Sequence, residues 1–525
     1  MSAGMRMKSK APQIPGSSRW NLRARLLTGT CLLVLTGWPP GDAGAAPASH
    51  GRILAEKYCS SCHLFPEPEL LTKTAWSHHI LPEMAKWLGM ERVDFEGMAD
   101  GKLIEEAKIY PGTPLLPEAD WFAIWDYYRD AAPSRPLPQP PKTPPTRPLR
   151  QFKPHRFNPI PGAPMISMTR IRAPGRLQVA DAFAGILFSL DKTGAVTAKE
   201  KFNSPVVSIA QGQRRSYVTL IGRIFPSDAQ EGAVLVWPDG SERGPRPLLE
   251  NLRRPTDAIA ADLNQDGRED LAVCQFGNRL GQFSWFENKG DNQYEEHVLL
   301  DRPGALTVKA IDLTRDGRPD LLVLTGQSRE ALYLFTNEGQ GRFTSKALIE
   351  KPPSWGFASF ELVDMNRDGF TDVLTVNGDN GDFAVPLKAY HGIRLYRNDG
   401  TNQFKEVFFY PMHGAYKAIA RDFDGDGDTD IAAVAFYPDF ESAAPEGFVY
   451  LENIGDDKFV ASTCDEALFG RWMTMDVGDL DGDGDDDLAL GSFVKGPTTV
   501  PISASRREQW RTNGTAVLYL ENLKR

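Results

Sequence analysis

The sequence predicts a multidomain chain in which a small all-α domain precedes an all-β propeller of about seven four-stranded blades. Five Asp-rich segments recur at intervals of 50, 52, 58 and 57 residues, starting at Asp262, Asp312, Asp364, Asp422 and Asp479. A period near 50 residues with only short strand patterns is typical of propeller blades. A Pro-rich stretch separates this repetitive part from an N-terminal part with helical apolar spacing.

Length and composition agree with this division. The chain has 525 residues, which is too long for one ordinary core. Hydrophobic residues make up 41% and charged residues 24%, which excludes wholesale disorder and a polytopic membrane protein. The net charge of -10 argues against nucleic acid as a partner. Because the acids are clustered, we expect them to bind cations.

The N-terminus has the pattern of an export signal over residues 1–45. Three arginines precede an apolar run from Leu26 to Trp38, and small residues follow it up to Ala45. We expect cleavage near Ala45, no membrane span in the mature chain, and a periplasmic or secreted protein. An uncleaved anchor is the alternative. Cys31 would leave with the signal.

Four cysteines remain, and two of them lie in the segment Tyr58-Cys59-Ser60-Ser61-Cys62-His63. Two thiols at this spacing can form thioethers with one porphyrin, while the adjacent histidine coordinates the iron. A redox-active C-x-x-C pair would usually begin a helix after a strand, and a zinc site needs a second ligand pair that this chain lacks. The motif therefore predicts one haem c held by Cys59, Cys62 and His63.

Helical patterns flank this motif. Residues 51–58 predict a helix that runs into it, and residues 117–131 predict a last helix with an apolar stripe of Trp121, Ile124, Trp125 and Tyr128. Together with the motif, these patterns make the segment from about Ala48 to Pro133 similar to class I cytochromes c. The resemblance implies a haem domain over residues 46–133, crossed terminal helices, and a methionine as the second axial ligand of the iron.

We expect Met84 to be that ligand. Pro82 interrupts the helical pattern beside it, and residues 76–89 resemble a stretch found in short cytochrome domains fused to propellers. The alternatives are Met90, Met98, His78 and His79. Each methionine could also simply fill the core.

The next two segments are predicted to be a linker and a propeller. Residues 134–162 hold many prolines between Arg and Lys, which favours an extended, semi-rigid spacer. Residues 163–525 contain the five Asp-rich repeats, each continuing into an apolar strand, an aromatic strand and a Gly turn. Two weaker units, at 179–190 and 217–238, have strand and turn patterns without an Asp-rich loop. Seven blades are therefore expected, with six or eight as alternatives.

The Asp-rich loops have the spacing of a calcium site. Oxygens at positions 1, 3 and 5, a backbone carbonyl at 7 and a carboxylate at 9 can surround a hard cation, while glycine at 6 permits the turn. EF-hands are excluded because no Glu stands at position 12. Ordinary Asp-Gly hairpin turns are the alternative without metal, but they do not need five acids in nine residues. Three to five calcium ions are expected, with the loop containing Thr314 the weakest.

The predicted ligands are the five odd positions of each loop, with position 7 acting through its carbonyl: Asp262, Asn264, Asp266, Arg268, Asp270, Asp312, Thr314, Asp316, Arg318, Asp320, Asp364, Asn366, Asp368, Phe370, Asp372, Asp422, Asp424, Asp426, Asp428, Asp430, Asp479, Asp481, Asp483, Asp485 and Asp487. Residues from about 255 to 525 thus resemble the FG-GAP or VCBS repeats of integrin α-chain propellers. The resemblance implies that each loop joins two strands of one blade and binds calcium.

Taken together, these features predict an exported electron-transfer protein with haem as its redox group and the propeller as a docking platform. The expected partners are a redox protein and a polysaccharide or protein ligand. Two alternatives stay open: an oxidoreductase whose propeller binds substrate and passes electrons to the haem, and an adhesion or carbohydrate-binding propeller with an accessory haem. We find no nucleophile–base pair, dinucleotide loop or repeated Trp-docking pattern, which favours an electron carrier over an enzyme.

Overall fold

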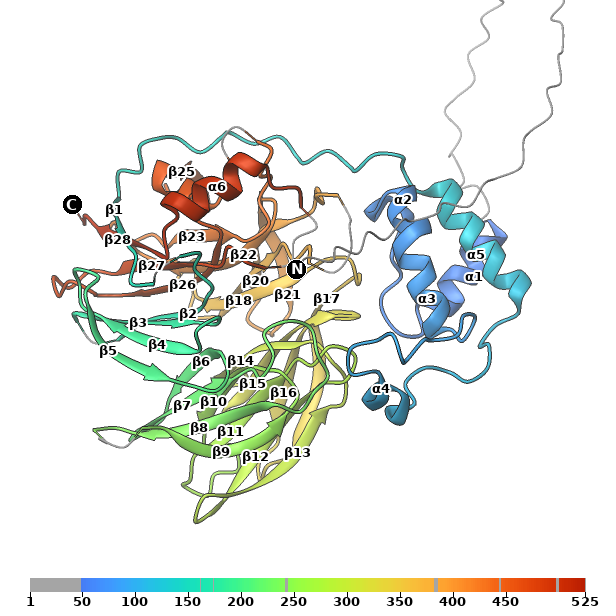
Figure 1. Cartoon of the computed structure of the whole chain (residues 1–525), viewed down its shortest axis with the longest axis horizontal. Coiled ribbons are helices and arrows are strands. Elements are labelled where there is room, and N and C mark those ends of the chain that lie inside the picture. The colour runs from blue at the N-terminus through green and yellow to red at the C-terminus, as the bar shows by residue number, and fades with distance from the viewer. Residues whose placement is uncertain are drawn as a thin grey trace, which may run out of the picture. The chain divides into compact units, whose positions relative to one another are not determined.

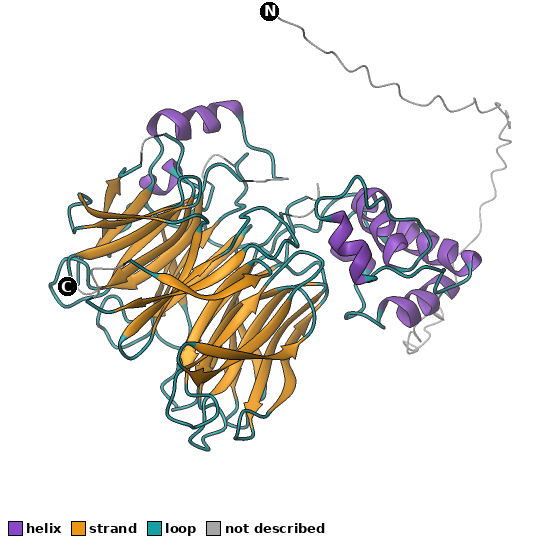
Figure 2. Ribbon diagram, turned by 60° about the horizontal axis from the view of Figure 1, so that its bottom comes forward, coloured by secondary structure: helices purple, strands orange, loops and turns teal. Residues whose placement is uncertain are grey.

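The computed structural model describes residues 49–160, 162–172, 174–240, 244–381, 386–442, 445–496 and 500–524. The predicted signal segment, including the cleavage position near Ala45, lies outside these residues. Residues from Ala48 onward form one compact unit. In this unit a group of short helices is followed by strands β1 to β28 (Figure 1 and Figure 2). Within the described ranges, no helix is long and apolar enough to cross a membrane.

Short helices surround one apolar core in the N-terminal region. Their bounds are α1 His50–Cys59, η1 Pro68–Leu70, α2 Lys73–Ala75, η2 Trp76–Ile80, α3 Leu81–Trp87, α4 Gly101–Ala107 and α5 Glu118–Ala131. The predicted terminal helices pack against each other. A Cβ atom on Gly51 would lie 2.3 Å from the Ala123 carbonyl oxygen, so only glycine permits this approach. The apolar stripe of α5 faces the core, with Trp121, Ile124 and Tyr128 buried.

The structure differs from expectation at Pro82, which does not break the helical run. Helices α2, η2 and α3 follow one another without a gap from Lys73 to Trp87. The π-helical η2 lies directly before Pro82, and the N–H of Leu81 bonds the carbonyl of Trp76 five residues earlier. This wider turn accommodates a residue that lacks an N–H donor. Met84 consequently lies inside α3, within this continuous helical run.

Seven four-stranded antiparallel sheets form the propeller, which confirms the expected blade count. Blades one to four contain β2 Ile166–Arg172, β3 Arg176–Asp181, β4 Ile186–Leu190, β5 Val196–Lys201, β6 Val206–Gln211, β7 Arg215–Leu220, β8 Gly232–Pro238, β9 Arg246–Leu252, β10 Pro255–Ala261, β11 Asp270–Gln275, β12 Gln282–Gly290, β13 Gln293–Leu300, β14 Ala305–Ile311, β15 Asp320–Gln327, β16 Arg329–Asn337 and β17 Phe343–Lys351.

Blades five to seven contain β18 Phe357–Val363, β19 Asp372–Asn377, β20 Gly392–Asn398, β21 Phe404–Pro411, β22 Ala415–Arg421, β23 Asp430–Ala435, β24 Phe448–Asn453, β25 Phe459–Ser462, β26 Trp472–Gly478, β27 Asp487–Ser492, β28 Val517–Asn522 and β1 Phe152–Phe157. The first strand of each blade contacts the first strands of both neighbouring blades, so the ring is closed. Two further helical segments, η3 Asp465–Phe469 and α6 Ala504–Asn513, lie in the loops of the last two blades.

A strand from before the first blade completes the last one. Strand β1 pairs antiparallel with β28, from Phe152 opposite Asn522 to Phe157 opposite Val517. These six residues were predicted to be part of the linker. Pro154, which cannot donate a backbone hydrogen bond, is tolerated because β1 is the outer edge of its sheet. The linker itself also contacts the propeller, because the Thr146 N–H donates to the Ala461 carbonyl at 2.9 Å.

The propeller core lies between neighbouring blades. Seven apolar clusters fill the seven blade interfaces, including the one between the last blade and the first. The second strands of blades three and five to seven, such as β11 and β23, are buried along their whole length, which explains the mostly apolar residues at their centres. Between blades three and four, for example, the rings of Phe283 and Phe335 lie 5.3 Å apart.

Candidate functional site

All five Asp-rich loops join the first and second strands of their blades, in blades three to seven. They connect β10 to β11, β14 to β15, β18 to β19, β22 to β23 and β26 to β27. Because successive strands of each sheet are antiparallel, these loops all lie at the same end of the blades. The loops between second and third strands lie at the other end.

The first carboxylate of a loop accepts hydrogen bonds from the backbone of the same loop. Asp262 accepts bonds from the N–H of Asp266 at 3.1 Å and from that of Gly267 at 2.9 Å. This path needs left-handed backbone at position 6, as predicted, and also at position 4, where Gln265 has a φ of 63°. The last two loops have glycine at position 4, whereas the first three accept a cost of about 1 kcal/mol there.

The carboxylate at position 9 fastens each loop to the third strand of its blade. Asp430 is fully buried, and its Oδ1 accepts a bond from the Asn453 N–H at 2.8 Å. Its Oδ2 accepts bonds from the Phe423 N–H at 3.2 Å and from the Tyr450 hydroxyl at 2.7 Å. Burial raises the pKa of Asp430 to about 7. Position 9 was predicted only as a calcium ligand, but these bonds also give it a structural role.

This pairing of an aspartate with an asparagine N–H, which we call the Asp–Asn clip, recurs in all five blades. The asparagine side chain completes it by donating to the carbonyl of position 8, as Asn453 does to Thr429 at 3.1 Å. The five clips are Asp270 with Asn288, Asp320 with Asn337, Asp372 with Asn398, Asp430 with Asn453, and Asp487 with Asn522. Sequence reasoning missed the asparagines, although one stands at the end of the aromatic strand in every Asp-rich repeat.

The last two loops crowd three carboxylates each. Oxygens of three side chains lie within 4.8 Å of one another in both loops, from Asp422, Asp424 and Asp426 and from Asp479, Asp481 and Asp483. Burial and repulsion by neighbouring acids raise the pKa of Asp485 to about 6. Charges this close repel one another unless a cation lies between them. These two loops therefore offer the most favourable oxygen ligands for calcium in the described chain.

The first two Asp-rich loops instead contain their own positive charge. Arg268, at position 7, forms an ion pair with Asp266, and its Nε donates to the Asn288 carbonyl at 2.7 Å. Arg318 makes the same two contacts, with Asp316 and with the carbonyl of Asn337. Position 7 was predicted to contribute only a backbone carbonyl. A guanidinium on the position 5 carboxylate neutralises part of the charge that would attract calcium.

The third loop is intermediate between these two types. Asn366 Nδ2 donates to Asp368 Oδ2 at 2.9 Å, so an amide rather than a guanidinium contacts the position 5 carboxylate. Arg367 points to the next blade, where its guanidinium lies 3.9 Å from Asp422. By the positive charge already beside the position 5 carboxylate, the last two loops are the most favourable of the five predicted calcium sites, the third loop is intermediate, and the first two are the least favourable.

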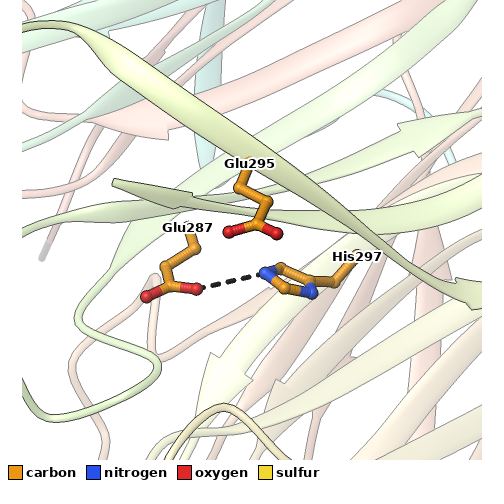
Figure 3. Close-up of side chains that lie close together, drawn as sticks. All are labelled: Glu287, Glu295 and His297. Carbon is orange, nitrogen blue, oxygen red and sulfur yellow. Dashed lines mark hydrogen bonds and ion pairs between the residues drawn. The ribbon is translucent and has the colours of Figure 1, made fainter. Parts of the chain in front are cut away.

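A separate cluster on β12 and β13 brings together Glu287, Glu295 and His297 (Figure 3). The His297 Nε2 atom lies 3.1 Å from Glu287 Oε2. The Lys289 ammonium lies 2.7 Å from the Glu287 carboxylate and 2.9 Å from the Glu295 carboxylate. Its bond to Glu287 lowers the pKa of that carboxyl group. Because Lys289 already neutralises the two acids, we assign the cluster as an ion-pair network at the blade surface.

The C-x-x-C-H motif lies at the C-terminal end of α1. Cys59 is the last residue of the helix, and burial raises the pKa of its thiol to about 11. Cys62 is exposed, and neither cysteine forms a disulfide. The His63 Nδ1 atom lies 2.9 Å from the Leu64 carbonyl oxygen, which fixes the ring so that Nε2 is the nitrogen left for a metal. Two separate thiols beside such an imidazole are the donor set that haem c requires.

The candidate sixth ligands differ in their surroundings. Met84 and Met90 pack against the same apolar core as Cys59, together with Leu54 and Trp76. Met98 is not part of that core, and His78 is exposed. His79 is half-buried on η2. The structure therefore places Cys59, Met84 and Met90 around one core, and the assignment of Met84 as the sixth ligand stays a prediction.

Comparison with known proteins agrees with the propeller. Residues 262–323 and 312–375 match the FG-GAP-like repeat family. The ring is a seven-bladed β-propeller, and residues 262–375 of it resemble FG-GAP-like repeats. Integrin alpha-PS3 of Drosophila melanogaster is 27% identical over 177 residues, which are 30% of this chain and 16% of that protein. Integrin alpha-4 of Xenopus laevis is 28% identical over 183 residues, which are 31% of this chain and 17% of that protein. The chain thus covers only a small part of either relative.

Solved structures similar to this chain include other proteins of distant sequence. A chain from the structure of BBS1N in complex with ARL6DN aligns with 71% of this chain and 97% of its own length, with a TM-score of 0.40 and 11% identity. A chain from the structure of S. cerevisiae dbp5 bound to nup159 and gle1 aligns with 70% of this chain and 94% of its own length, with a TM-score of 0.38 and 9% identity. The propeller fold itself rests on the seven four-stranded sheets, and the likeness to FG-GAP-like repeats rests on residues 262–375.

Proposed function

We propose that this chain is an exported electron-transfer protein. One haem c is attached through Cys59 and Cys62 and ligated by His63, and the FG-GAP propeller serves as a docking platform for a partner. Haem c, when bound, supplies a one-electron redox couple. The observation that carries this proposal is the C-x-x-C-H motif at the end of α1, with two thiols outside any disulfide and a histidine ring whose Nε2 is available.

The helical core supports Met84 as the sixth ligand. Met84 packs with Cys59 against the core between α1 and α5. A thioether from α3 would stabilise the reduced iron, which suits an electron carrier. Met90 is the alternative within the same core. With His63 and Met84 both as ligands, the haem would exchange electrons rather than bind a substrate.

The propeller contributes rigidity and a surface for recognition. Integrin relatives match this chain, which favours a protein or polysaccharide ligand for the FG-GAP blades. We propose three to five calcium ions in the Asp-rich loops, with the loops at Asp422 and Asp479 filled first because they hold the most uncompensated acid. A periplasmic or secreted location, after removal of residues 1–45, fits a calcium-dependent fold.

Covalent haem attachment tests the proposal directly. The full chain is produced in a host that matures c-type cytochromes and is then extracted with acidic acetone. We expect the haem to stay with the protein, because thioether bonds resist this treatment. A variant with both Cys59→Ser and Cys62→Ser should lose the haem, whereas the matched control Cys464→Ser, a buried thiol in blade six, should keep it. Haem released from the wild-type chain would refute the proposal.

A further inference from the structure

Four consecutive blades contact the helical region through the loops between their second and third strands. In blade two, the Asp100 carboxylate accepts bonds from the Ser227 hydroxyl at 2.6 Å and from the Asp228 N–H at 2.8 Å. In blade three, the Arg279 Nε donates to the Tyr110 hydroxyl at 2.8 Å. In blade five, the Tyr390 hydroxyl lies 3.4 Å from the Leu70 carbonyl. The helices are thus held at the end of the blades opposite to the Asp-rich loops.

Blade four makes the contact nearest to the chemistry. Arg329 is the first residue of β16 and follows Ser328, whose φ of 48° turns the chain sharply between β15 and β16. The Arg329 Nε atom donates to the Cys62 carbonyl oxygen at 2.7 Å. This carbonyl lies between the second cysteine and the histidine of the C-x-x-C-H motif. A propeller side chain therefore holds the backbone of the haem-attachment segment.

The bond also brings a permanent charge to the motif. A guanidinium stays protonated at every pH at which the protein is folded. The guanidinium contacts the carbonyl of Cys62, which directly precedes His63, so its charge lies close to the histidine that would hold the iron. Oxidation adds one positive charge at an iron held by His63, so a nearby cation disfavours the oxidised state.

We propose that Arg329 is a positioning residue for the haem motif and that it raises the reduction potential of the haem. The proposal rests on the haem function proposed above and extends it by assigning to the propeller a role in setting the potential. The planar guanidinium fixes the segment between Cys62 and His63, and its charge stabilises the reduced form. The FG-GAP propeller then does more than dock a partner, since one of its blades adjusts the redox group itself.

Redox titration of the full chain tests this role with two variants. Arg329→Gln removes the charge and keeps a side chain that can donate a hydrogen bond, and we expect a shift to lower potential. Arg329→Lys keeps the charge, so its potential should stay close to that of the wild type. The matched control is Arg223→Gln, which removes an arginine from the contact with Asp100 in blade two. This control should leave the potential unchanged.

The outcomes separate the two proposals. If the wild-type chain carries no covalent haem, the proposed function fails before any potential is measured. If haem is attached and Arg329→Gln titrates like the wild type, the role of Arg329 is overturned while the proposed function stands. Equal downward shifts in the Gln and Lys variants would also overturn it, because the charge would then not matter. Thermal unfolding of the propeller should be the same in all variants, which shows that any shift is local.

Discussion

Replacement of Asp430 by alanine should weaken the propeller whether or not calcium is present. The carboxylate accepts bonds from three donors: the N–H groups of Phe423 and Asn453 and the hydroxyl of Tyr450. All four residues are buried, so water cannot replace the lost acceptor. The loss therefore concerns the Asp–Asn clip itself and does not depend on a bound ion.

The size of this effect follows from the number of donors left without a partner. Each buried donor that loses its acceptor costs about 1 to 3 kcal/mol, which for three donors gives about 3 to 9 kcal/mol. Burial raises the pKa of Asp430 to about 7, so removing the carboxyl group also removes a desolvation cost. We therefore expect the lower end, about 3 kcal/mol.

Asp426→Ala is the matched control in the same loop. Asp426 is exposed, and its carboxylate accepts a bond from the Asp428 N–H at 2.7 Å. Without calcium its removal should cost little, since it relieves repulsion among three acids within 4.8 Å. With calcium at a hundredfold excess over Kd, the loss of one site should cost about 2.7 kcal/mol.

Urea unfolding of each variant, measured with calcium and with EGTA, distinguishes the two roles. Asp430→Ala should unfold at lower urea than the wild type in both buffers, whereas Asp426→Ala should do so only with calcium. If Asp430→Ala matched the wild type in EGTA, the clip would contribute nothing and position 9 would act only through the metal. If calcium changed none of the three unfolding curves, the loops would be ordinary hairpin turns.

Three further outcomes are expected. Burial raises the pKa of Glu330 to about 8, above its value in the unfolded chain, so the free energy of unfolding should fall as pH rises from about 5 to about 8. The free energy of unfolding of Glu330→Gln, measured with urea, should depend less on pH. The same pH dependence in both proteins would contradict this. Gly414→Ala should lower the free energy of unfolding far more than Gly317→Ala in the same assay. Both glycines have positive φ, but a Cβ atom at position 414 would lie 2.1 Å from a backbone atom, whereas a Cβ atom at position 317 would meet open space. Arg268→Ala should increase the affinity for calcium, measured by calorimetry, because Asp266 loses its ion pair. Unchanged affinity would mean that this arginine does not compete with the ion.

The blade count could be predicted because one local pattern recurs at nearly constant spacing. Each Asp-rich loop fixes the position of two strands, and short-range spacing is visible in the sequence. The Asp–Asn clip could not be predicted, since it joins residues 17 to 35 positions apart whose pairing depends on the register of the strands. Strand β1 was missed because Pro154 and the preceding prolines indicate a spacer, and only the partner β28 makes it a strand.

The candidate sites show the same division between local and long-range information. The C-x-x-C-H motif is contiguous, so the haem hypothesis comes from its residue types alone and stays a prediction, to which the structure adds the orientation of His63. The contact of Arg329 with Cys62 joins residues 267 positions apart and has no sequence signal. Arg268 and Arg318 were visible at position 7, but their side chains fold back onto the loop only because the third strand offers a carbonyl beside them.

The pairing of β1 with β28 has a consequence for synthesis. Strand β1 leaves the ribosome before any other strand of the propeller, and β28 leaves it after all of them. Until β28 arrives, the last blade has unpaired edges on both β1 and β27, and such edges attract other chains and proteases. A chain that stops before β28 therefore cannot complete its last blade, and the edges of β1 and β27 stay open to aggregation and proteolysis.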